Sequence, residues 1–245
     1  IGFGAAGGIN NDSAIRNVFI GEYAGYGGTG ALNYSVAIGY RALDSTGTSG
    51  DPSGTVAIGY YAGADVTEGQ RNVLMGYQAG LSMTTMDDTV AIGYGAGDAL
   101  TTGTGRNTII GSGAGSDLTT ESQNVAIGSS ALGTATNASN VIAIGHRAAV
   151  ALSHGDSSGT IAIGALALEG ATGAHGRNIA IGYRAINNAT TNVAGAIALG
   201  HETMYSNTDN TGNIAIGYFA LRDSSGGSSR DYNVAIGYEA MRNAN

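Results

Sequence analysis

Val36-Ala37-Ile38-Gly39-Tyr40 is a short phrase that returns along the whole chain and decides the fold. The same five residues recur at 56–60, 90–94 and 234–238. The glycine of the phrase marks 14 copies, spaced 17 to 20 residues apart: Gly2, Gly21, Gly39, Gly59, Gly76, Gly93, Gly111, Gly128, Gly145, Gly164, Gly182, Gly200, Gly217 and Gly237. Such periodicity is typical of repeat architectures, in which each unit contacts mainly its neighbours. We therefore expect a single repetitive domain over residues 1–245.

The composition excludes several classes of protein. The 245 residues include 43 Gly and a single Pro but no Cys, so a disulfide scaffold and thiolate metal sites are excluded. The net charge of −8 argues against nucleic-acid binding, which needs a basic face. No run of 18 apolar residues is present, and we expect no membrane insertion of this segment. Because the chain begins in mid-phrase at Ile1-Gly2, we expect it to be a segment of a longer protein.

The residues around each glycine alternate in character. Numbered from the marker glycine, position −3 is Val or Ile in nearly every copy, position −1 is Ile or an equivalent, and position −2 is usually Ala. Position +3 is Ala in every copy except at Thr203. Side chains of a strand alternate between its faces, and a strand that is apolar on both faces is buried on both. We expect the Val/Ile face to fill the interior of each coil, and the Ala/Gly face to pack on identical chains around a common axis.

These positions define a structural ladder that repeats from coil to coil. Its expected members in three copies are Val36, Ile38, Gly39, Ala42, Val56, Ile58, Gly59, Ala62, Val90, Ile92, Gly93 and Ala96. The segments between phrases are rich in Gly, Ser, Thr, Asn and Asp, which favour turns, and the single proline, Pro52, lies there. A second, outer strand is expected in fragments such as 64–67. The sequence thus predicts an all-β parallel β-solenoid of about 14 coils.

The stretch Asn124-Val125-Ala126-Ile127-Gly128, followed by Ala131, resembles the head repeats of YadA-like trimeric autotransporter adhesins and the related repeats of bacteriophage tail fibres. This resemblance covers essentially the whole chain. It implies a left-handed parallel β-roll, three chains packed about one axis, and an extracellular surface that binds host matrix or receptor molecules. The repeats here are longer than those of the adhesin heads, and Tyr follows the glycine unusually often.

A second resemblance is rejected. Residues 38–43 match one hexapeptide of the left-handed β-helix acyltransferases, but only one of the three hexapeptides expected in each coil matches.

Two positions after the glycine are candidates for binding. Position +1 is often Tyr, as at Tyr40, Tyr60, Tyr77 and Tyr94; these rings form either a strip for sugars or, as we favour, a column of stacked rings. Position +2 varies freely among fixed neighbours, which indicates exposure. The expected receptor-binding residues, for a host-surface glycan or protein, are Tyr23, Arg41, Tyr61, Gln78, Arg147, Arg184 and Phe219.

Polar residues before the phrase are expected to have structural roles. Arg precedes Asn at Arg16, Arg71, Arg106 and Arg177, and we expect these arginines to pair with loop carboxylates such as Glu68 or Asp65. The recurring Asn, as at Asn72 and Asn124, is expected to satisfy backbone groups. The pair Asp87-Asp88 is interpreted as a solvated turn. His146, His154, His175 and His201 lack metal-site spacing, and we expect neither a metal nor a cofactor.

Three functions remain open. The favoured one is a structural and adhesive segment of a trimeric fibre, on a virion or a bacterial cell surface, without enzymatic activity. The second is a monomeric solenoid that binds ice or a glycan, although regular Thr arrays are missing from the sequence. The third is a glycan-cleaving tail spike, which needs paired acids; Asp98, Asp117 and Asp156 are scattered through the loops.

Overall fold

The structure is a computed structural model that describes residues 1–8, 15–27, 32–45, 52–152, 157–170, 176–188, 193–206, 211–223 and 231–243. Its contacts divide the chain into two compact units, residues 1–123 and 124–245, which we describe separately. The single domain over residues 1–245 stays a prediction. All regular secondary structure within these ranges is β-strand.

Every strand is three residues long and coincides with positions −3 to −1 of the phrase. The first unit contains β1 (Val18–Ile20), β2 (Val36–Ile38), β3 (Val56–Ile58), β4 (Val73–Met75), β5 (Val90–Ile92) and β6 (Thr108–Ile110). The second unit contains β7 (Val125–Ile127), β8 (Ile142–Ile144), β9 (Ile161–Ile163), β10 (Ile179–Ile181), β11 (Ile197–Leu199), β12 (Ile214–Ile216) and β13 (Val234–Ile236).

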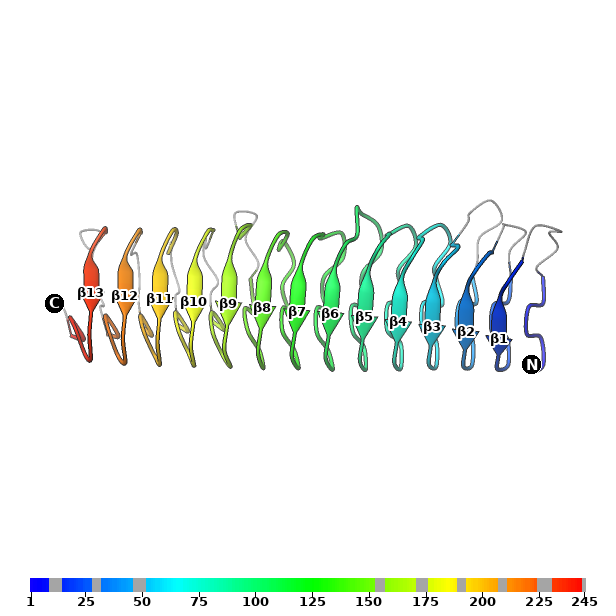
Figure 1. The fold of residues 1–245 in the computed structure, drawn as a ribbon, viewed down its shortest axis with the longest axis horizontal. Helices are drawn as coiled ribbons and strands as arrows, with labels where there is room; N and C mark the ends of the chain where they lie inside the picture. The colour runs from blue at the N-terminus through cyan, green and yellow to red at the C-terminus, as the bar shows by residue number, and fades with distance from the viewer. Residues whose placement is uncertain are drawn as a thin grey trace. The chain divides into compact units, whose positions relative to one another are not determined.

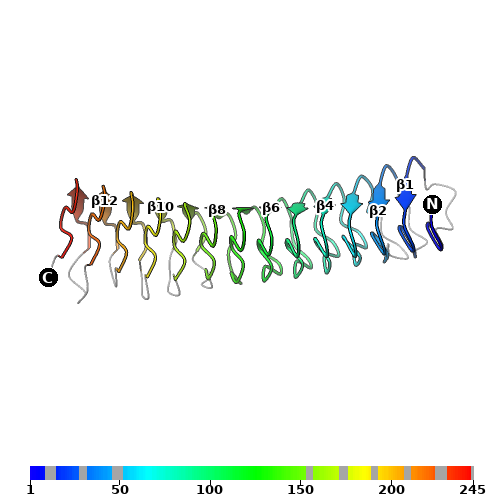
Figure 2. The same ribbon diagram turned by 90° about the horizontal axis from the view of Figure 1, so that it is seen from below.

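Within each unit the strands pair in chain order, parallel and in register, so that the same position of successive copies lies side by side (Figure 1). Val56, for example, pairs with Val73, and Ile58 with Met75. Turn segments close each coil away from its strand (Figure 2). The predicted parallel β-solenoid is therefore confirmed. The expected second strand at residues 64–67 is wrong: this segment is a turn, in which Val66 is fully buried.

The prediction for the two faces of the strand is also wrong. From β2 to β13 the middle residue, usually Ala, is buried, whereas the Val or Ile on either side of it is half-buried or exposed. Ala37, Ala57 and Ala91 are fully buried, as are the alanines at position +3 from Ala24 to Ala220. The coil is thin, so small residues point inward and the β-branched residues form the outer face of the sheet.

Two positions share the filling of each coil. Where the strand carries a large middle residue, position +4 is glycine: Phe19 goes with Gly25, Leu74 with Gly80, and Ile109 with Gly115. A Cβ placed on Gly80 would lie 2.8 Å from Leu74 Cδ2, and one on Gly63, in the preceding coil, 2.5 Å from Leu74 Cδ1. In the second unit the strands carry Ala, and position +4 is larger, as in buried Leu132, Leu168 and Ile186. A large side chain at one of these two positions thus fills the interior beside a small residue at the other, which keeps the core closely packed.

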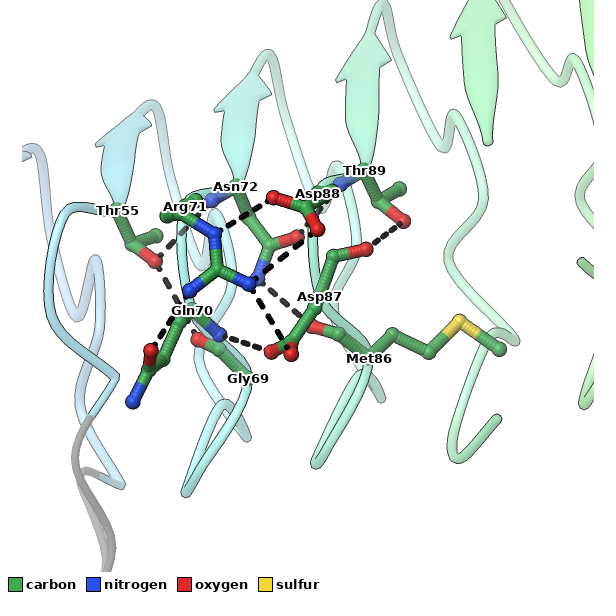
Figure 3. A network of polar contacts seen from close by, with 9 residues as sticks. All are labelled: Thr55, Gly69, Gln70, Arg71, Asn72, Met86, Asp87, Asp88 and Thr89. Carbon is green, nitrogen blue, oxygen red and sulfur yellow. Dashed lines mark hydrogen bonds and ion pairs between the residues drawn. The ribbon is translucent and has the colours of Figure 1, made fainter. Parts of the chain in front are cut away.

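The recurring Asn before the strands has a structural cause. Asn72 is fully buried; its Nδ2 donates to Met86 O at 2.8 Å, and its Oδ1 accepts from Thr89 N at 2.9 Å (Figure 3). Asn124 makes the equivalent pair with Ala138 O and Val141 N, and Asn178 with Val193 O and Ala196 N. Each side chain thus joins its own coil to the next. The predicted role of Asn in satisfying backbone groups is confirmed.

Replacement of Asn72 with alanine is expected to destabilise the first unit by about 2–4 kcal/mol, because it leaves a buried carbonyl and a buried N–H without partners. Chemical denaturation monitored by circular dichroism measures this change. Asn188→Ala, at an exposed position, is the matched control and is expected to stay within about 0.5 kcal/mol of the wild type. Equal effects of the two substitutions would contradict the role assigned to Asn72.

Candidate functional site

A column of tyrosine rings runs along the first unit at position +1. The rings of Tyr40, Tyr60, Tyr77 and Tyr94 stack nearly parallel, with successive centroids 5.3, 5.0 and 5.1 Å apart. In-register strands place this position of one coil directly beside that of the next, which explains the stack. The predicted column of stacked rings is therefore confirmed. The rings stay partly exposed, at the end of the outer sheet face.

The second unit has a similar column that includes a histidine. Tyr183, His201, Tyr218 and Tyr238 follow one another at position +1, with centroids 5.1, 4.9 and 5.6 Å apart. Each unit therefore presents a column of aromatic rings along its own coil surface.

The predicted receptor residues of the first unit lie beside this column. Arg41 places its Cζ 5.5 Å from the ring centroid of Tyr23 and 5.7 Å from those of Tyr40 and Tyr61. Such cation–π contacts hold the guanidinium over aromatic faces. Gln78 occupies the same position in the copy at Gly76 and is half-buried. The structure thus brings Tyr23, Arg41 and Tyr61 into one cluster.

In the second unit the position +2 residues belong to a second cluster and to separate ion pairs. Arg147 forms an ion pair with Glu169 at 2.9 Å. Arg184 lies 5.2 Å from the ring centroid of Tyr183 and 3.6 Å from Glu202. Phe219 packs on Tyr218, with centroids 4.0 Å apart, and also contacts two arginines.

Sequence reasoning missed position +5, which supplies the partners of position +2. Arg41 pairs with Asp44 at 3.5 Å and Arg242 with Glu239 at 2.7 Å, within one copy. Arg222 pairs with Glu202 of the preceding copy at 2.8 Å. Opposite charges three residues apart in the turn were the sequence signal for this arrangement. Positions +1, +2 and +5 therefore form one edge of each unit, which we name the aromatic edge.

The arginine before Asn72 lies in a different network. Arg71 Nε is 2.7 Å from Asp88 Oδ1, and its Nη2 is 3.3 Å from Asp87 Oδ2 (Figure 3). Asp87 Oδ1 also accepts from Gln70 N at 2.7 Å. The predicted pairing with loop carboxylates is confirmed for Arg71. The expected partners Glu68 and Asp65 are wrong: the acids come from the next coil, because in-register stacking brings that turn beside Arg71. Arg16 donates instead to the hydroxyl of Tyr34.

The pKa of Asp88 is lowered, first by its hydrogen bond with Arg71. A lowered pKa in the folded state stabilises the fold above the ordinary carboxyl pKa of about 4, and this contribution disappears as the pH falls through the lowered pKa. We expect Arg71→Gln to be less stable than the wild type at about pH 6, with a difference that shrinks toward about pH 2. Urea denaturation at both pH values measures it, with exposed Arg177→Gln as the control. A difference that is independent of pH would contradict this pairing.

Other candidates are not assembled into a site. In the described part of the chain, no group of three or more His, Cys, Asp or Glu residues is placed to hold a metal ion. His154, His175 and Asp156 lie outside the described residues. No helix that is long and apolar enough to cross a membrane occurs in the described ranges.

Comparison with protein-family models, with curated proteins and with solved structures gives no match for this chain.

Proposed function

We propose that this chain is a structural and adhesive segment of a homotrimeric extracellular fibre, either a phage tail fibre or a bacterial surface adhesin. The observation that carries the proposal is the apolar outer face of each sheet. Its Val and Ile side chains are half-buried or exposed along both units; Ile20, Met75 and Ile181 are 42, 37 and 38 % exposed. A continuous apolar surface of this kind is typical of a protein interface.

The periodicity of this face favours a second copy of the chain as its partner. Strands of a sheet repeat at about 4.8 Å, so the apolar columns of each unit repeat at that spacing. A partner that fits over many coils needs the same spacing, and an identical chain has it. Three copies around one axis give every chain the same environment and leave no open interface. The proposed face is the Val/Ile face, in place of the buried alanine face.

The finer architecture belongs to the same proposal. We take each of the 14 marker glycines to define one coil of a left-handed roll, as the resemblance to adhesin and tail-fibre repeats implies. The copy at Gly2 supports this count, since Ile1 O accepts from Gly21 N at 2.9 Å and Phe3 O from Tyr23 N at 2.9 Å. These bonds continue the stacking of coils beyond β1.

Ile92→Glu tests the interface. Ile92 is half-buried on the outer face of β5, so a single chain tolerates a glutamate there. In a trimer the same glutamate of the other two chains would lie near it around the axis, and the like charges would repel. We expect light scattering to show a fall from three chains to one, with an unchanged circular dichroism spectrum. Ile92→Leu is the control and is expected to retain the native mass. An unchanged mass for Ile92→Glu would show that this face is not the interface.

The adhesive part of the proposal is placed on the aromatic edge, where half-buried or exposed arginines and tyrosine rings lie together. It is tested by binding of the labelled protein to arrays of glycans and matrix proteins. A variant with Arg41, Arg147 and Arg184 replaced by serine is expected to lose binding. Serine is compatible with the backbone at position +2, because Ser130 occupies that position with φ 54°. Absence of binding by the wild type would reduce the segment to a spacer.

A further inference from the structure

The aromatic edge of the first unit changes at Tyr94, where the tyrosine column stops. Tyr77 stacks on one face of Tyr94, and the next coil carries Ser112 at position +1, which has no ring. Tyr94 is 64 % exposed, whereas Tyr77 and Tyr60 are 42 and 43 % exposed. The last ring of the column therefore offers a face that no aromatic neighbour covers.

The turn residues that follow Tyr94 include no large side chain at position +2. Position +2 is glycine in this copy and in the next, at Gly95 and Gly113. Asp98 occupies position +5, and a Cβ placed on Gly95 would lie 3.5 Å from Asp98 Oδ2, so this oxygen lies within contact distance of a side chain at position 95. No arginine of the described ranges pairs with Asp98, and its Oδ1 is buried without a hydrogen-bond partner there.

The copy at Gly39 shows which group fits between such residues. It carries Tyr40, Arg41 and Asp44 at the same three positions. Arg41 Nε lies 3.5 Å from Asp44 Oδ2, and its Cζ lies 5.7 Å from the Tyr40 ring centroid. The copy at Gly93 therefore retains the tyrosine and the aspartate of this arrangement and lacks only the arginine.

We propose that the niche formed by Tyr94, Gly95 and Asp98 binds the guanidinium group of an arginine side chain from a partner protein. The ring face offers a cation–π contact, and the carboxylate offers charge-assisted hydrogen bonds. The net charge of −8 attracts a basic partner to the chain. The proposal deepens the adhesive function by naming the chemistry of the receptor.

The electrostatics of Asp98 agree with this assignment. Burial raises its pKa, backbone N–H groups oppose the rise, and the charge of Asp117 adds to it. The folded chain therefore holds the Asp98 carboxylate without a compensating cation, and a bound guanidinium supplies one.

The test uses the native protein and a pentapeptide, acetyl-Gly-Gly-Arg-Gly-Gly-amide, observed by saturation-transfer difference NMR, which detects weak binding to large proteins. The same peptide with citrulline, which has the shape of arginine without its charge, is the ligand control. We expect saturation of the arginine side-chain protons and none for citrulline. Equal saturation of both peptides would overturn the proposal. Stronger competition by glucosamine than by free arginine would overturn the assignment to a protein partner in favour of an amino sugar.

Three protein variants separate the niche from general charge. Asp98→Asn is expected to weaken peptide binding about tenfold or more, whereas Glu68→Gln, an exposed acid without a ring beside it, leaves it unchanged. Gly95→Arg is expected to fill the niche with its own guanidinium, abolish peptide binding and raise the melting temperature. Arg41 adopts φ 53° at this position, close to the 56° of Gly95, so the backbone accepts the change.

Peptide binding that survives both Asp98→Asn and Gly95→Arg would overturn the proposal. This outcome is distinct from failure of the adhesive function: loss of array binding in the triple-serine variant, together with an absence of peptide binding, would keep the adhesive edge and remove only this niche.

Discussion

Replacement of Gly76 with alanine is expected to reduce the stability of the first unit by about 3 kcal/mol or more. Gly76 has φ +138°, a conformation that L side chains rarely adopt. An added Cβ would also overlap the carbonyl oxygen of Gly93 in the next coil. The marker glycine is therefore required both by its own backbone and by the close stacking of neighbouring coils. Chemical denaturation followed by circular dichroism measures the change.

Gly237→Ala separates these two causes. Gly237 has a similar φ of +127°, but a Cβ there meets nothing within 4 Å. We expect backbone strain alone to lower the free energy of unfolding of this variant, by about 1–3 kcal/mol. If the two alanine variants were destabilised equally, close approach of the coils would not explain the repeated glycine.

Leu74→Ala is expected to cost about 2–5 kcal/mol, because it opens a cavity in a thin interior. Leu74 is fully buried in β4, in a position that is usually alanine. Gly63 and Gly80 lie against its side chain and cannot fill the space that it leaves. The melting temperature and the midpoint of denaturation measure the loss.

Gly80→Leu is expected to restore much of this stability when combined with Leu74→Ala, although alone it overfills the coil. The backbone accepts the change, since Leu43 adopts φ 51° at the same position and Gly80 has φ 59°. The double variant then reproduces the alanine and leucine pairing of the copy at Gly39. A double variant that is no more stable than Leu74→Ala would contradict the exchange of volume between these positions.

The spacing of the phrase was sufficient to predict the parallel β-solenoid and the position of its strands. It predicted the ladders because parallel coils in register repeat every side-chain position. The two faces were assigned wrongly because alternation separates Val and Ile from Ala but does not say which side is inside. The missing information was the width of the coil: Ala37 and Leu43 together fill it, and Val36 and Ile38 have no room there.

The candidate site was predictable in part. Variation at position +2 identified Arg41 and Tyr61, which the structure brings together with Tyr40. The partner acids were missed where they come from another coil, as for Arg147 and Glu169, because their separation in sequence depends on loop length. The niche at Tyr94 could not be predicted from the sequence, because it results from the absence of a side chain at Gly95. The structure of the copy at Gly39 shows that Arg41 occupies the corresponding position.

The native mass of the unaltered segment, measured by light scattering in solution, tests the central claim most directly. We expect three times 24.3 kDa, because the apolar outer faces of both units then pack on identical chains. A mass of 24.3 kDa over the whole concentration range would contradict it. The Val and Ile columns would then face water, and the chain would be a monomeric solenoid with a flat binding surface.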